Sequence, residues 1–199
     1  FPTRRSSDLY RPRFAGDALP RNHTGTVLAL ADKLETLVGM FGVGNLPTGD
    51  KDPFALRRHA LGVIRMLVEK QLPLDLPQLL QATSQTFGTL LPDPAKSNAQ
   101  LLDFIYERVA GYLREHGASA QEADAVIAAR PMWGEMPKAL AAVRAFAQLP
   151  EAAALAAANK RIGNILKKAG DAEQVVDAHV SEVLLVEEAE KSLYAAMQQ

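Results

Sequence analysis

The sequence contains no cysteine, no long apolar run and almost no excess of charge of either sign. The absence of cysteine excludes disulfides, zinc–thiolate sites and thiol nucleophiles. Apolar runs stay shorter than the roughly 18 residues expected of a membrane-spanning helix. Lys and Arg together number 22 and Asp and Glu 23, which gives a net charge of -1. Any site for a polyanion must therefore be a local patch, because the whole chain supplies no attractive field.

Signals for catalysis and metal binding are also sparse. The four histidines have no partner at a recognised metal-ligand spacing, and no serine lies in a nucleophile-elbow context. Asp32 lies among apolar residues, but no histidines upstream of it complete a metal site. The lone tryptophan, Trp133, is interpreted as a packing anchor rather than a base-stacking platform. We therefore assign no catalytic and no metal-binding residue.

The apolar pattern predicts an all-α helical bundle. Hydrophobic residues make up 48% of the chain, enough for a buried core, and no segment shows the alternation typical of a strand. Ser119–Glu122 reads as a capping box that opens a short helix. Longer helices are expected over 24–41, 52–72, 76–87, 97–116, 136–149, 150–170 and 176–197.

A proline-containing stretch interrupts this pattern near the middle of the chain. "LLPDPAKSN" (Leu90–Asn98) has two prolines and no apolar periodicity. We predict a linker over 91–96 that joins two helical lobes.

The segment "GNLPTGDKDPFALRRHALGVIRML" (Gly44–Leu67) resembles a phosphate-binding loop only in its glycine spacing. Gly44 and Gly49 are five positions apart, but Asp50 stands where such a loop needs lysine, and a helix rather than a strand precedes it. A carboxylate there would repel phosphate. We therefore predict an exposed helix–helix connection.

The helix after this connection is expected to begin at Asp52–Pro53. Asp52 is the predicted N-cap, and Pro53 would occupy the first helical position. Phe54 is placed in the buried stripe of this helix. The opposite, outward side is assigned the arginines Arg57, Arg58 and Arg65.

The segment "NKRIGNILKK" concentrates positive charge on one helix. Lys160, Asn164 and Lys168 recur at i, i+4 and i+8 and share a face, flanked by Arg161 and Lys167. Such a face suits a phosphate backbone, with the asparagine free to touch a base or sugar. A different face carries the apolar stripe, which we expect to be buried in the bundle: Leu155, Ile162, Ile165 and Leu166.

The alternative for this basic face is packing against the acidic end of the chain. Residues 151–170 contain four basic residues and one acidic residue, net +3, whereas residues 171–199 contain seven acidic residues and one basic residue, net -6. The sequence does not decide between an RNA-binding face and a solvated face that pairs with that acidic helix.

Several motifs together resemble the β subunit of bacterial glycyl-tRNA synthetase. The family-specific core is "PTGDKDPFALRRHALG", preceded by "YRPRFAGDALP". Further on, "LLDFIYERVAGYLREHG", "AFAQLPEAAALAAANKRIGNILKK" and "EEAEKSLYAAM" are similar to the helical anticodon-binding domain of that family. The resemblance covers about Tyr10–Gln199.

The resemblance implies a domain layout and a function. Residues 10–50 would end an HD-type helical domain, 51–90 would be connecting helices, and 97–199 a C-terminally truncated anticodon-binding domain. The implied function is that of a tRNA-binding part of a cytoplasmic glycine–tRNA ligase, in which this fragment forms no adenylate and is inactive alone. Implied partners are glycine tRNA and the α subunit, in a heterotetramer of two α and two β subunits. The resemblance also implies that the holoenzyme uses ATP and magnesium and that this fragment itself binds no cofactor.

Together, the charge pattern and the resemblance nominate tRNA-binding residues. They are Arg57, Arg58, Lys160, Arg161, Asn164, Lys167 and Lys168. Two rival functions remain. One is a helical scaffold without a nucleic-acid role. The other is a remnant of an HD-type phosphohydrolase: Asp32 matches one metal-ligand position of such an enzyme, and the histidines that complete the site would lie upstream.

The first nine residues stand apart from this scheme. "FPTRRSSDL" matches the translation of a common sequencing-library adapter. We expect residues 1–9 to be an assembly artefact and the natural chain to extend upstream; the alternative is a genuine basic arm.

Overall fold

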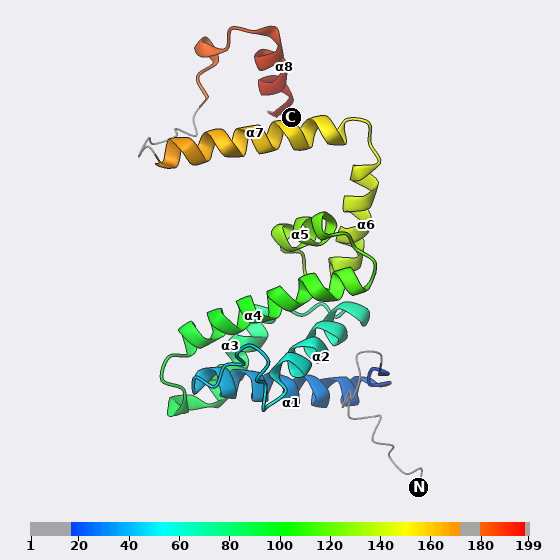
Figure 1. Cartoon of the computed structure of the whole chain (residues 1–199), viewed down its shortest axis with the longest axis vertical. Helices are drawn as coiled ribbons and strands as arrows, with labels where there is room; N and C mark the ends of the chain where they lie inside the picture. Colours follow the sequence, from blue (N-terminus) through cyan, green and yellow to red (C-terminus); the bar gives the residue numbers. More distant parts are fainter. Residues whose placement is uncertain (1–16, 172–179, 198–199) are drawn as a thin grey trace. The chain divides into compact units, whose positions relative to one another are not determined.

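The computed structural model describes residues 17–171 and 180–197, and all of its regular structure there is helical. The only β-type pairing in these residues is an isolated bridge between Thr48 and Lys51. This confirms the all-α prediction (Figure 1). The α-helices are α1 (His23–Gly42), α2 (Leu56–Glu69), α3 (Leu76–Thr86), α4 (Pro94–Glu115), α5 (Ala120–Ala129), α6 (Met136–Ala147), α7 (Ala152–Asp171) and α8 (Glu188–Met197).

Short polar side chains start several of these helices. The Asn22 side chain accepts a hydrogen bond from the backbone N–H of Gly25, 2.7 Å away, at the start of α1. At α5 the predicted capping box is confirmed: Glu122 N–H donates to Ser119 Oγ at 3.2 Å, and Ser119 N–H donates to Glu122 Oε2 at 2.7 Å. Each cap satisfies N–H groups that have no partner inside the helix.

The core lies where α1, α2, α3 and α4 pack together. Leu37 of α1, Ile64 and Leu67 of α2, and Leu101 and Ile105 of α4 are completely buried. α4 also contacts α5, and α6 packs against α5 (Figure 1). Burial of each such side chain contributes roughly 1.5–3 kcal/mol, so this cluster provides most of the driving force for folding.

The segment between α5 and α6 closes onto this core. Trp133 is buried, with its ring 5.3 Å from that of Tyr106, as expected of a packing anchor. Gly134 follows at a point of close backbone approach: a Cβ there would lie 2.7 Å from the carbonyl carbon of Gln71. Only glycine fits such a contact without moving the main chain.

The predicted linker at 91–96 is not a boundary between lobes. α4 begins at Pro94, inside that range, because the Asp93 carboxylate accepts from Lys96 N–H at 3.0 Å and proline suits the first turn. α4 then packs against α1, α2 and α3. The chain divides instead into two compact units, 1–147 and 148–199. The proposed identities of the domains stay predictions.

α2 begins later than the sequence predicts. Its first residue is Leu56, after Ala55 adopts a left-handed conformation with φ of 53°. Phe54 therefore lies outside the helix. It does not join the buried stripe as predicted, and 43% of its surface is exposed.

The position of Arg65 also differs from the sequence prediction. It is 9% exposed rather than on an outward face, because α1 and α4 both pack against α2. Its Nε donates to Glu69 Oε1 at 2.6 Å and its Nη1 to the Asp17 carbonyl at 2.9 Å. The buried guanidinium is thus paired and hydrogen-bonded, as a buried charge requires.

The last predicted helix is shorter than 176–197. Residues 172–179 lie outside the described residues, and so do residues 1–16, which include the suspected adapter. In the described part, Glu182–Leu184 form a single 3-10 turn and α8 starts at Glu188. The Glu190 carboxylate accepts hydrogen bonds from Val186 N–H at 2.9 Å and Glu187 N–H at 3.0 Å, which fixes this start.

Candidate nucleic-acid interface

The polar face of α7 is where the structure groups most of the predicted tRNA-binding residues. Lys160, Asn164 and Lys168 are exposed and follow one another at one-turn intervals. A shallow hollow of about 380 Å³ lies along them. Its lining is Ala157, Lys160, Arg161, Asn164, Ile165 and Lys168. Lys167 is exposed but does not line the hollow.

The hollow exists because a small residue is surrounded by long ones. Ala157 offers only a methyl group, whereas Lys160 and Arg161 begin long flexible side chains one turn further on. Three cationic groups and one amide thus border a depression on a single helix face. Cations satisfy phosphate oxygens, and an amide both donates to and accepts from base edges.

Most of the apolar stripe of α7 lies on the opposite side of the helix. At 100° per residue, Leu155, Ile162 and Leu166 project about 160–180° away from Asn164. Ile165 projects about 100° away and also lines the hollow. The stripe is not buried as predicted: 54% of Leu155, 54% of Ile162, 56% of Ile165 and 47% of Leu166 is exposed. The described residues of the chain do not cover this stripe.

Among the described residues, no ion pair joins the basic face of α7 to the acidic end of the chain. Within residues 17–171 and 180–197, the ion pairs join Arg65 to Glu69, Arg108 to Glu107, and Arg144 to Glu122. None of them involves a cation of α7. The alternative of a face paired with the acidic segment therefore finds no support among the described residues.

The two nominated arginines of α2 have different environments. The Arg57 guanidinium folds back and donates through Nη2 to the Gly49 carbonyl. Arg58 is exposed. The structure therefore engages Arg57 within the α1–α2 loop and leaves Arg58 facing solvent. Neither arginine shares an element with the α7 face.

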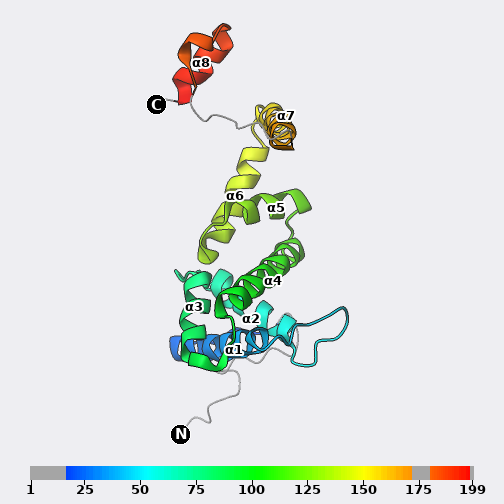
Figure 2. The same cartoon turned by 90° about the vertical axis from the view of Figure 1, so that its left-hand side faces the viewer.

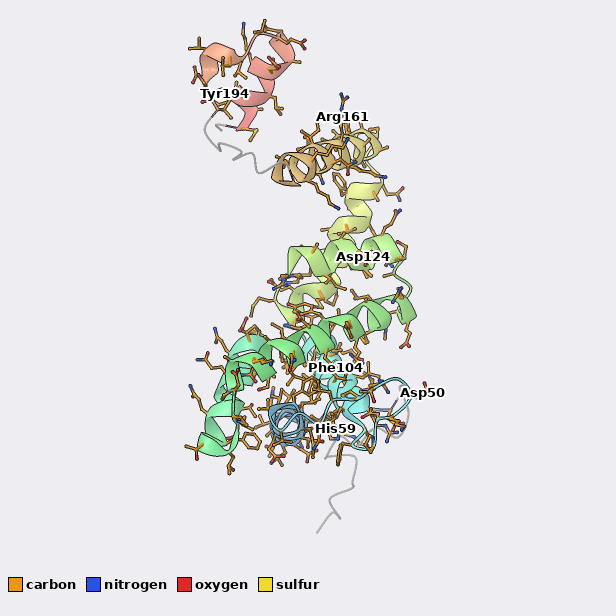
Figure 3. The ribbon with its side chains drawn as sticks, turned by 60° about the vertical axis from the view of Figure 1, so that its left-hand side comes forward. Asp50, His59, Phe104, Asp124, Arg161 and Tyr194 are labelled. Atoms are coloured by element: carbon orange, nitrogen blue, oxygen red, sulfur yellow. The ribbon has the colours of Figure 1, made fainter. Side chains whose placement is uncertain are left out.

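One cationic group near this loop was missed by the sequence reasoning. Arg108 of α4 stacks on Phe104, with its guanidinium carbon 3.3 Å from the ring centre. The Phe104 ring, which is labelled in Figure 3, lies 5.0 Å from that of Phe41 of α1. Burial lowers the pKa of Arg108 from its usual value. The i, i+4 spacing of Phe104 and Arg108 was the available signal.

His59 of α2 has a half-buried ring whose Nδ1 has no hydrogen-bond partner among the described residues. Burial, and next the nearby Lys33, lower its pKa from the ordinary value of 6.5. Asp32 is exposed. Within the described ranges, no three His, Asp or Glu side chains converge as metal ligands would. Those ranges also contain no helix long and apolar enough to cross a membrane.

In the described residues, the fold and this surface define the class of the chain as an all-α protein in which one helix, α7, has a basic face. Comparison with known proteins narrows this further. Residues 5–128 match the family described as glycyl-tRNA synthetase beta subunit. The chain belongs to this family.

Individual relatives agree with the family match. The chain is 69% identical to the glycine–tRNA ligase beta subunit of Paracidovorax citrulli, 67% to that of Leptothrix cholodnii and 58% to that of Thiobacillus denitrificans. Each of these alignments covers 96% of this chain but 26% of the relative. The chain thus spans about a quarter of the length of these relatives.

Proposed function

We propose that this chain is a tRNA-binding part of a glycyl-tRNA synthetase β subunit, and that it supports the ATP-dependent attachment of glycine to its tRNA. The observation that carries the proposal is the sidedness of α7. Its cations border a hollow on one face, and Leu155, Ile162 and Leu166 of its apolar stripe lie on the other. A helix of this kind can pack through one face and bind an RNA backbone through the other.

The proposal assigns roles to the nominated residues. Lys160, Arg161, Lys167 and Lys168 contact phosphates of the tRNA, and Asn164 contacts an unpaired base or its sugar. Arg58 adds a phosphate contact from α2, and Arg57 acts mainly by holding the loop that precedes it. This division follows from the hydrogen bond of Arg57 to Gly49 and from the exposure of the other side chains.

The proposed partners are a glycine tRNA and the synthetase α subunit, in a cytoplasmic assembly of two α and two β subunits. Adenylate formation, with its ATP and magnesium, would belong to the α subunit. The α1–α2 loop has an aspartate, Asp50, where a phosphate-binding loop carries lysine. This chain's own contribution is to bind and orient the tRNA.

The test uses a full-length β subunit that carries this chain, together with its α subunit. Lys160→Ala and Lys168→Ala should each weaken glycine-tRNA binding and lower the slope of log affinity against log salt by about 1, because each removes one phosphate contact. Lys191→Ala in α8, which also removes an exposed lysine, is the matched control and should change neither. Filter binding at several salt concentrations gives both quantities.

Asn164→Ala addresses recognition rather than affinity. It should alter discrimination among anticodon variants of the tRNA more than overall binding, since an amide reads base edges and carries no charge. If the lysine variants keep the affinity and salt slope of the parent, the α7 face is structural. A helical scaffold would then be the better description of this chain.

A further inference from the structure

The α1–α2 loop is held in one conformation by its own hydrogen bonds. It projects beyond the helices in Figure 2. Thr48 and Lys51 exchange two backbone hydrogen bonds of 3.1 and 2.8 Å, and Asn45 N–H donates to the Met40 carbonyl at 2.9 Å. Arg57 adds its bond to the Gly49 carbonyl. A loop fixed in this way loses little conformational entropy when it binds a partner.

The end of the loop is fixed by Asp52. Its carboxylate accepts from Leu56 N–H at 2.7 Å and from Arg57 N–H at 3.0 Å. The charges of Asp52 and Arg57 are therefore both engaged within the loop and the first turn of α2. Asp50 is a carboxylate of the loop tip that stays exposed (Figure 3).

Three side chains around this fixed end remain directed outward. Phe54 is 43% exposed, and Lys51 and Arg58 are exposed three positions before it and four positions after it. In the part of the chain that the structure describes, neither cation makes an ion pair or a side-chain hydrogen bond. An exposed aromatic ring on a rigid projecting loop is a stronger indication of a binding site than a single exposed leucine elsewhere on the surface.

We propose that Lys51, Phe54 and Arg58 form a second RNA contact, in which an unpaired nucleotide of the tRNA stacks on Phe54. The proposal rests on the proposed tRNA-binding function and extends it to a surface in the other compact unit. An aromatic ring offers a stacking face to any base that is not paired, and flanking cations hold the adjacent phosphates. Lys51 and Arg58, both exposed, supply the positive charge that such phosphate contacts need.

The experiment measures glycine-tRNA binding by a full-length β subunit that carries this chain, together with its α subunit. Phe54→Leu keeps an apolar side chain but removes the stacking face, and should weaken binding about tenfold. Phe54→Trp retains a stacking face and should bind like the parent. Lys51→Ala and Arg58→Ala should each lower the salt slope by about 1.

Val43→Ala and Leu46→Ala are the matched controls. Both residues are exposed and belong to the same connection, but neither has an aromatic ring or a charge. Both variant β subunits should bind tRNA with the affinity of the parent. Both should also associate with the α subunit like the parent, as measured by size-exclusion chromatography.

Three results separate this proposal from its rivals. If Phe54→Leu binds tRNA like the parent while Lys160→Ala and Lys168→Ala bind weakly, the loop proposal is wrong and the α7 proposal stands. If none of these variants changes binding, both are wrong. If Phe54→Leu and Leu46→Ala instead release the α subunit without changing RNA affinity, the loop is a protein interface and the RNA contact is overturned.

Discussion

Internal hydrogen bonds decide which charged residues of this chain are available to a partner. Arg57 and Arg58 are neighbours in sequence, yet one is bound to the Gly49 carbonyl and the other is exposed. Arg65 is buried and engaged by Glu69. A count of basic residues in this segment therefore overstates its capacity to bind an anion.

His59 should make the stability of the fold depend on pH. Its pKa is lowered in the folded state, mainly by burial, so the unfolded chain binds the proton more readily. The contribution of His59 is complete above the unfolded pKa of about 6.5 and is lost as the pH falls through that value toward the folded pKa. One such group changes the free energy of unfolding by at most about 1.4 kcal/mol per pH unit.

Urea unfolding of the purified chain between pH 7.5 and about 5 measures this dependence. The control is His59→Gln, which fills similar space without titrating in this range and should show a smaller loss of stability on acidification. An identical pH dependence in the two proteins would mean that His59 ionises as freely when folded as when unfolded.

At the scale of elements, the start of α2 depends on one carboxylate. Asp52→Ala leaves the N–H groups of Leu56 and Arg57 without their acceptor, and should lower the free energy of unfolding by about 1 kcal/mol. Asp52→Asn keeps a side-chain acceptor and should lose less. Urea unfolding at pH 7 compares the two; equal stabilities of the alanine variant and the parent would contradict a capping role.

Two Asp–Pro pairs show what local sequence can and cannot predict. At Asp93–Pro94 the carboxylate accepts from the N–H three residues on, and α4 begins at the proline. At Asp52–Pro53 the Asp52 carboxylate accepts from the N–H groups of residues 56 and 57, four and five positions later, and α2 begins at Leu56. Nothing about Ala55 signals the left-handed conformation that causes this difference, because alanine adopts it only when the surroundings impose it.

The elements of the chain were largely predictable, whereas their surroundings were not. The capping box at Ser119–Glu122 and the helical periodicity are local signals, and both are confirmed. The burial of Arg65 and the exposure of Phe54 depend on how α1 and α4 pack against α2, which periodicity does not encode. For the candidate site, the i, i+4, i+8 spacing on α7 correctly predicted a shared face.

At the scale of the whole molecule, the boundary between units lies after α6 rather than at the prolines. Residues 87–93 connect α3 to α4, Leu91 among them is buried in the core, and both helices belong to that same core. The stripe of α7 and its basic face both lie in the second unit, 148–199. The first unit therefore contains the hydrophobic core, and the main feature of the second unit is the two-sided helix α7.

Site-specific crosslinking determines which side of α7 contacts RNA. In a full-length β subunit that carries this chain, with its α subunit and glycine tRNA, a photo-crosslinking residue is placed at one position at a time. Asn164→p-benzoylphenylalanine lies on the basic face, and Leu155→p-benzoylphenylalanine lies on the apolar stripe. If the basic face of α7 binds tRNA, irradiation crosslinks tRNA from position 164 and leaves position 155 without RNA adducts. Equal crosslinking from both positions, or crosslinking from position 155 alone, would contradict tRNA binding by the basic face.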